Sequence, residues 1–126
     1  MAGPYAGVRV IELGRFIAAP YCGQLLADGG ADVIKVEPLM GDDARRNGTR
    51  LSATEARQYL NKNRSKRSIA VDLRNPEVQA VLQSLAHDAD VIIANFRPGQ
   101  GARLGLDYDT LLSLIHISEP TRPRLI

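Results

Sequence analysis

The sequence Ala89-Asp90-Val91-Ile92-Ile93-Ala94-Asn95-Phe96-Arg97-Pro98-Gly99 joins an apolar run to a polar, basic turn that a glycine closes. The apolar run at residues 91–94 is typical of a buried strand. In an open α/β sheet, ligands bind at the carboxyl ends of the strands. We therefore predict that residues 89–99 contain a strand of a sheet and the beginning of a binding site.

A strand, a helix and a second strand are predicted at the start of the chain. Residues 8–13 are rich in β-forming side chains, and Pro20 suits the first turn of the helix that follows, where a missing N–H costs little. The pair Gly29 and Gly30 ends this helix, and residues 33–36 form the second strand. Such a βαβ unit implies that the two strands are parallel.

The middle of the chain continues this alternation. The segment SATE at residues 52–55 matches a capping box and predicts a helix over residues 53–60, and residues 68–73 are predicted to form a strand. Asn75 then caps a further helix, with Pro76 at its first position. The apolar stripe predicted on that helix comprises Val78, Val81, Leu82, Leu85 and Ala86. The order of elements predicts the α/β class, with a Rossmann-like, doubly wound and mostly parallel sheet.

The composition indicates one domain that binds neither nucleic acid nor membrane. The chain has 126 residues, 44% of them hydrophobic, and a formal net charge of +2, which is too small to favour nucleic acid. No apolar run approaches the ~20 residues that a membrane-spanning helix needs. The single cysteine, Cys22, fits a reducing compartment. We therefore expect a cytoplasmic protein, and we expect no metal site.

A nicotinamide-binding dehydrogenase is the first alternative for such a fold. Glu37 ends the second predicted strand, where these folds hold a ribose. However, the turn after the first strand, LGRFIAAPYCG at residues 13–23, lacks the G-x-G-x-x-G pattern. The dehydrogenase reading is therefore not favoured. On composition alone, the basic residues between positions 45 and 67 are typical of solvated loops.

Five segments in order resemble the N-terminal part of the class III coenzyme A transferases, the CaiB/BaiF family. They are residues 7–13 (GVRVIEL), 30–38 (GADVIKVEP), 63–73 (NRSKRSIAVDL), 89–99 (ADVIIANFRPG) and 103–106 (RLGL). The resemblance covers residues 5–112 and implies the first part of the large domain of such an enzyme, with an incomplete sheet. The chain departs from the family at Ala19, where glycine is usual, and at Ala94, where glutamate is usual.

The resemblance implies a set of coenzyme A contacts at the ends of the strands. Arginine side chains there can bind phosphates through their planar fork, and Phe96 can supply a ring face for adenine. Arg15 is expected to face the thioester, and Pro38 also aligns with a contact position. The implied contacts are Ile17, Ala18, Val71, Asp72, Leu73, Arg74, Asn95, Phe96, Arg97 and Arg103.

The resemblance also implies the reaction, its partners and where its nucleophile lies. The substrates are an acyl-CoA thioester and a carboxylic acid, no metal takes part, and the full-length parent is an interlocked homodimer. The nucleophile is an aspartate in a motif beyond this chain, so the chain contains no catalytic residue and is expected to be inactive. Two alternatives remain open: an α-methylacyl-CoA racemase of the same family, and a remnant that binds coenzyme A or nothing.

The end of the chain departs from the pattern of strands and helices. Residues 113–126 contain two prolines where the next strand is expected, and SLIHISEPTRP at residues 113–123 resembles translated sequencing-adapter sequence. We expect this tail not to belong to the natural protein. A native terminus is one alternative. An internal insertion is another, because PRLI at residues 123–126 is similar to the NPRLI with which the family opens its next strand.

Overall fold

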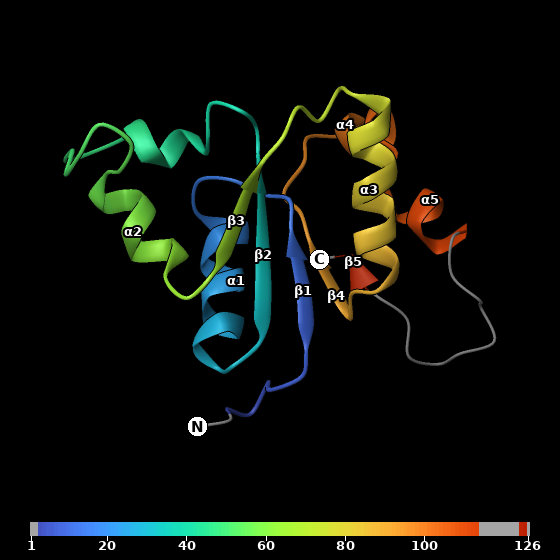
Figure 1. Ribbon diagram of the computed structural model, residues 1–126, viewed down its shortest axis with the longest axis horizontal. Helices are drawn as coiled ribbons and strands as arrows, with labels where there is room; N and C mark the ends of the chain where they lie inside the picture. The colour runs from blue at the N-terminus through green and yellow to red at the C-terminus, as the bar shows by residue number, and fades with distance from the viewer. Residues whose placement is uncertain (1–2, 114–123, 126) are drawn as a thin grey trace.

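The computed structural model describes residues 3–113 and 124–125, and its centre is a sheet of five parallel strands in the order β3-β2-β1-β4-β5 (Figure 1). The strands are β1 (Arg9–Glu12), β2 (Asp32–Glu37), β3 (Arg67–Ala70), β4 (Val91–Ile93) and β5 (Arg124–Leu125). The helices are α1 (Ala18–Asp28), the 3-10 helix η1 (Asp43–Arg46), α2 (Arg57–Asn63), α3 (Pro76–His87), α4 (Gln100–Arg103) and α5 (Tyr108–Ser113).

The strands are all parallel, but the direction in which the chain adds them to the sheet changes once. From β1 the chain builds outward through β2 and β3, and it then returns to place β4 on the other side of β1. Val10 is therefore paired with Val33 on one side and with Val91 on the other. This arrangement confirms the predicted α/β fold with a parallel, Rossmann-like sheet, and it places the reversal between β1 and β4.

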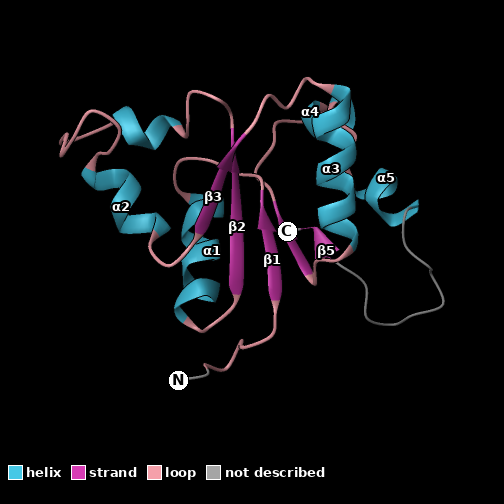
Figure 2. Cartoon of the chain, in the orientation of Figure 1, coloured by secondary structure: helices cyan, strands magenta, loops and turns pink. Residues whose placement is uncertain are grey.

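Each face of the sheet carries its own hydrophobic core, because successive side chains on a strand point to opposite faces. Val10 and Val33 pack with residues of α1, whereas Ile11 and Val36 pack with residues of α3. Helices therefore lie on both faces, α1 behind the sheet and α3 in front of it (Figure 2). This confirms that the sheet is doubly wound.

Helix α3 begins where the sequence predicts. The Asn75 side chain accepts a hydrogen bond from the Glu77 N–H at 2.9 Å, and Pro76 takes the first helical position. Leu82 and Ala86 are buried as expected. Val81 lies at the margin of the apolar stripe and is 58% exposed, so its predicted burial is wrong.

Helix α2 begins four residues later than predicted. Ser52 accepts a hydrogen bond from the Thr54 N–H at 3.3 Å, and the Glu55 carbonyl accepts from the Leu51 N–H at 3.0 Å, so these residues close a turn. The prediction of a helix over residues 53–60 is wrong in its start, because local side-chain bonds compete with the helix.

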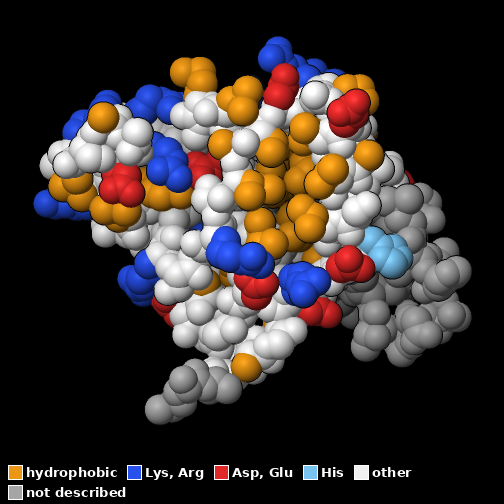
Figure 3. Space-filling view, viewed as in Figure 1, with side chains coloured by type: hydrophobic (Ala, Val, Ile, Leu, Met, Phe, Trp, Pro, Cys, Tyr) orange, Lys and Arg blue, Asp and Glu red, His pale blue; other side chains and the backbone are white. Residues whose placement is uncertain are grey.

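The front face of the sheet is only partly covered by a helix. Figure 3 shows hydrophobic side chains gathered on this face beside α3. The core cluster of this face includes partly buried hydrophobic residues at its border: Ile34, Ile69, Val71, Leu73, Val78 and Leu85. In the described part of the chain, no helix combines the length and apolar character needed to cross a membrane.

Candidate functional site

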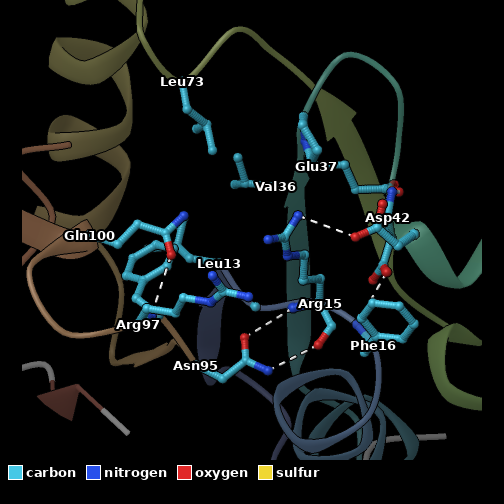
Figure 4. Close-up of a pocket in the computed structure, with 14 residues that line it drawn as sticks. Leu13, Arg15, Phe16, Val36, Glu37, Asp42, Leu73, Asn95, Arg97 and Gln100 are labelled. Carbon is cyan, nitrogen blue, oxygen red and sulfur yellow. Dashed lines mark hydrogen bonds and ion pairs between the residues drawn. The ribbon is translucent and has the colours of Figure 1, made fainter. Parts of the chain in front are cut away.

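A pocket of about 390 Å³ lies at the reversal of the sheet, where β1 and β4 end (Figure 4). In open α/β sheets this crevice is the usual place for a ligand. The lining residues come from four separate parts of the chain: the end of β2 with the loop after it, and the segments that follow β1, β3 and β4. They are Leu13, Gly14, Arg15, Phe16, Val36, Glu37, Pro38, Asp42, Asp43, Leu73, Asn95, Phe96, Arg97 and Gln100.

The pocket brings together four of the contacts expected from the sequence, Leu73, Asn95, Phe96 and Arg97. The other six lie near it on the same edge of the sheet but do not line it. Ile17 and Ala18 stand at the start of α1, Arg103 ends α4, and Val71, Asp72 and Arg74 follow β3. Two of the latter contact each other: Asp72 accepts from the Arg74 N–H at 3.0 Å and from its Nε at 3.2 Å.

The turn after β1 is held by Asn95 at the end of β4. The Asn95 Oδ1 accepts from the Arg15 N–H at 3.1 Å, and its Nδ2 donates to the Arg15 carbonyl at 2.9 Å. A side chain at Gly14 would clash with both Ala19 and Asn95, so this close approach requires glycine. The amide of Asn95 therefore orders the wall of the pocket.

Two arginines bring positive charge to the pocket. The Arg15 guanidinium forms an ion pair with Asp43 at 3.2 Å, and Asp43 also pairs with Arg46 at 2.9 Å. The Arg97 guanidinium has no hydrogen-bond or ion-pair partner among residues 3–113 and 124–125. An unpaired guanidinium at a pocket edge is suited to bind an anion.

The start of α1 adds a third feature that favours anions. Its N-cap residue, Ile17, makes no side-chain capping bond, and its first turn carries no acidic residue. Backbone N–H groups at a helix start carry a partial positive charge. The start of α1 lies next to the turn that lines the pocket, so it favours the binding of an anionic ligand group there.

Glu37, at the end of β2, is fully engaged by its neighbours. Arg45 donates to both carboxylate oxygens, at 2.8 and 2.9 Å, and Tyr59 and Ser68 also donate to it. Burial opposes ionisation, but the hydrogen bonds from Arg45, Ser68 and the Asp42 N–H outweigh it and lower the pKa of Glu37 to about 2. Both carboxylate oxygens of Glu37 are thus occupied and are not available to the hydroxyl groups of a ribose. The residue that suggested a dehydrogenase therefore does not support that alternative.

The residues that engage Glu37 also pack on one another. The Arg45 guanidinium lies 3.7 Å from the centre of the Tyr59 ring, and burial together with the Glu37 charge raises the pKa of that phenol. Arg45 is therefore part of the folded core of the loop, and its interpretation as a solvated loop residue is wrong.

A buried ionic cluster shares Asp42 with the pocket and consists of two lysines and two carboxylates, Glu12, Lys35, Asp42 and Lys66. Lys35 Nζ is 2.8 Å from Glu12 Oε2 and 2.8 Å from Asp42 Oδ2, and Lys66 Nζ is 2.6 Å from Glu12 Oε1. Burial lowers the pKa of Lys66, against the attraction of Glu12. The charges balance in number, which is the condition for keeping them in the interior.

Sequence reasoning missed the acidic residues of the pocket, Asp42 and Asp43. A signal was present, because Gly41 and Asp42 lie in a long polar loop after the second strand, and long ordered loops are often functional. The pairing of these carboxylates with Arg15 and Lys35 depends on the folding of that loop over the ends of β1 and β2. In the described residues, no group of three or more His, Cys, Asp or Glu could hold a metal ion.

Comparison with known proteins agrees with this geometry. The sequence matches the model of CoA-transferase family III over residues 5–117. It is 48% identical over 118 residues to the succinate–glutarate CoA-transferase of Agrobacterium fabrum, and the alignment covers 86% of this chain and 29% of that protein. It is 42% identical over 124 residues to the succinyl-CoA–L-malate CoA-transferase beta subunit of Chloroflexus aurantiacus, covering 98% and 29% respectively.

A solved structure shows the same likeness in three dimensions. A CAIB/BAIF family protein from Brucella suis superposes with a TM-score of 0.85 and 40% identity, covering 91% of this chain and 32% of that one. The chain therefore spans less than a third of the length of these relatives.

Proposed function

The chain belongs to CoA-transferase family III, and we propose on that basis that it forms the coenzyme A-binding, N-terminal part of an enzyme that moves coenzyme A from an acyl-CoA thioester to a carboxylic acid. The observation that carries the proposal is the pocket at the reversal of the sheet. There Leu73, Asn95, Phe96 and Arg97, which come from two of the segments that carry the family resemblance, residues 63–73 and 89–99, line one cavity.

The chemistry of the pocket suits the nucleotide end of coenzyme A. Arg97, whose guanidinium has no partner among the described residues, can bind a phosphate, and Phe96 and Leu73, which line the same pocket, offer an aromatic ring and an aliphatic surface for adenine. The volume of about 390 Å³ lies within the usual range of small-molecule sites. The remaining contacts, from Ile17 and Ala18 to Arg103, are proposed to extend the site along the same edge of the sheet.

The nucleophile is proposed to be an aspartate outside this chain. Its carboxylate oxygen bonds to the acyl carbon while the carbon–sulfur bond breaks and the coenzyme A thiolate leaves. The thiolate then attacks the aspartyl carbonyl of the mixed anhydride and releases the first acid. The acceptor acid takes over coenzyme A by the reverse steps. Asp42 and Asp43 are both held in ion pairs, and the chain by itself is proposed to bind coenzyme A without turnover.

The substrates are proposed to be dicarboxylic acids. The names of the relatives from Agrobacterium fabrum and Chloroflexus aurantiacus give succinate, glutarate and malate as their acids. The second carboxylate of such an acid needs a cation near the thioester. Arg15 lines the pocket with about half of its side chain exposed, which supports this assignment.

Two further proposals concern the whole protein. We propose that the full-length parent is a cytoplasmic, interlocked homodimer. The partly covered apolar face beside α3 supports an additional covering layer from the rest of the parent or from its partner (Figure 3).

We also propose that residues 1–112 are the native part of the domain and that residues 113–126 are a foreign tail. Strand β5 lies at the end of this tail and pairs with β4, and this pairing leaves the alternative of an internal insertion open. Resequencing the gene across the codon of Leu114 decides this. A frame that continues into native sequence supports a foreign tail, and unchanged source sequence contradicts it.

Coenzyme A binding to the 126-residue chain tests the proposed function. Isothermal titration calorimetry is expected to detect coenzyme A and 3′-phosphoadenosine 5′-diphosphate, with Arg97→Ala weakening both by roughly tenfold. Arg57→Ala is the matched control, because Arg57 is an exposed arginine on α2 away from the pocket. Absence of binding, or equal losses in the two variants, would contradict the proposal.

A further inference from the structure

The turn that follows β1 contains a strained residue. Phe16 has a φ of 67°, a left-handed conformation that bulky side chains rarely adopt. Such a conformation persists only where the surrounding structure holds it. The side chain of Phe16 is 40% exposed, so its own packing is a weak restraint. The restraint must come from contacts to the backbone.

Two side chains hold this turn, one from each side of the pocket. Asn95, after β4, binds both backbone groups of Arg15. Asp42, in the loop after β2, accepts a hydrogen bond from the Phe16 N–H at 3.1 Å through Oδ1 (Figure 4). The strained residue is thus bonded to a carboxylate that lies 26 positions away in the sequence.

Asp42 is itself held at each of its polar groups. Its N–H donates to Glu37 Oε1 at 2.7 Å, its Oδ1 also accepts from the Ala44 N–H at 2.9 Å, and its Oδ2 pairs with Lys35 at 2.8 Å. Only 1% of the residue is exposed. Because the carboxylate cannot move with the turn, it determines where the turn lies.

We propose that Asp42 is a positioning residue, whose carboxylate holds Phe16 in its strained conformation and so places Arg15 and Phe16 against bound coenzyme A. The inference rests on the proposed function for the identity of the ligand. Without the bond to Asp42, the Phe16 backbone relaxes toward negative φ and the wall of the pocket between β1 and η1 shifts. A pre-organised wall binds more tightly, because less order is lost on binding.

Glu12 provides a matched control for the charge of Asp42. Both carboxylates lie 2.8 Å from Lys35 Nζ, and both are buried. They differ in their other partners: Asp42 Oδ1 accepts from the N–H groups of Phe16 and Ala44, whereas Glu12 pairs with Lys66 and, among the described contacts, does not bond Phe16. Glu12→Gln and Asp42→Asn therefore each remove one buried negative charge next to Lys35. Asp42→Asn keeps an amide oxygen that can accept from Phe16, and Asp42→Ala removes it.

The experiment measures amide hydrogen exchange at Phe16 by NMR and coenzyme A affinity by calorimetry, on the 126-residue chain and these three variants. Thermal melting of each variant reports whether it is folded. We expect Asp42→Ala to lose the protection of the Phe16 amide and to bind coenzyme A about tenfold more weakly than Asp42→Asn. Asp42→Asn and Glu12→Gln are expected to keep the protection and to match each other within about threefold in affinity.

Four outcomes of this experiment are decisive. Unchanged protection of Phe16 in Asp42→Ala overturns the proposal, and so does an affinity for Asp42→Ala equal to that of Asp42→Asn. If the unmodified chain binds no coenzyme A, the proposed function fails, and the exchange of the Phe16 amide alone then decides whether Asp42 holds the turn. If Asp42→Ala does not fold, a slower exchange of Phe16 in Asp42→Asn than in Asp42→Ser supports the proposal, and equal rates overturn it.

Discussion

Replacing Lys35 by methionine tests how much the buried ionic cluster contributes to the stability of the fold. Lys35 is completely buried and contacts Glu12 and Asp42, each at 2.8 Å. Without it, Asp42 keeps no ion-pair partner among residues 3–113 and 124–125. Removing one partner of a buried pair costs about 3–5 kcal/mol. At roughly 4 °C per kcal/mol for a chain of this size, the melting temperature should fall by about 12–20 °C.

The double variant separates charge from packing. Lys35→Met combined with Asp42→Asn leaves the Glu12–Lys66 pair, at 2.6 Å, as a balanced unit. We expect the double variant to recover at least about 1 kcal/mol over Lys35→Met alone, because the uncompensated carboxylate is gone. Urea unfolding followed by far-ultraviolet circular dichroism measures both values. Lys62→Met is the control, since the Lys62 ammonium bonds only to Gln58 on the surface of α2 in the described structure, and it should change stability by about 0.5 kcal/mol or less. A double variant less stable than Lys35→Met would refute the argument from charge balance.

Two other predictions concern acid stability and the turn after β1. The folded pKa of Glu37, about 2, lies below its ordinary value of 4.5, so its contribution is complete above about pH 4.5 and is lost as the pH falls toward 2. Lowering the pH over this range should therefore reduce the free energy of unfolding by up to about 3 kcal/mol, and Glu37→Gln should make the free energy of unfolding depend less steeply on pH. Equal slopes in the two proteins would contradict the low pKa of Glu37. Gly14→Ala inserts a methyl group against Ala19 and Asn95, and calorimetry should show coenzyme A binding weakened by about tenfold or more. Gly7→Ala is the control. Gly7 has a φ of 87°, but a side chain there meets open space, so the affinity should be unchanged.

The class of the fold and most of its elements follow from short-range patterns. The Asn75 cap and Pro76 specify the start of α3 within one turn. Gly30, which follows the end of α1, has a φ of 102°, and this backbone conformation does not continue a helix. The helix predicted at residues 53–60 shows the limit of such signals. The same four residues that match a capping box can also close a turn, and the local sequence does not decide between the two.

The candidate site was predicted in part for the same reason. Arg97, Phe96 and Asn95 stand directly after a strand, so their place at the ligand-binding edge follows from the strand itself. The role of the Asn95 amide does not follow from the local sequence, because its partner Arg15 lies 80 positions away. Nor does the engagement of Arg45 with Glu37, which a basic loop read by composition assigns to solvent.

By itself, the sequence determined the α/β class, the parallel βαβ start, the cap of α3 and the family, since each depends on residues a few positions apart or on motifs in order. Only the tertiary structure decided which groups are free to meet a ligand. Glu37 and Asp42 are occupied, and Arg97 has no partner among the described residues, because the order of strands β3-β2-β1-β4 sets which loops meet at the pocket. The availability of a charged side chain is a property of its neighbours in space, and those neighbours come from distant parts of the chain.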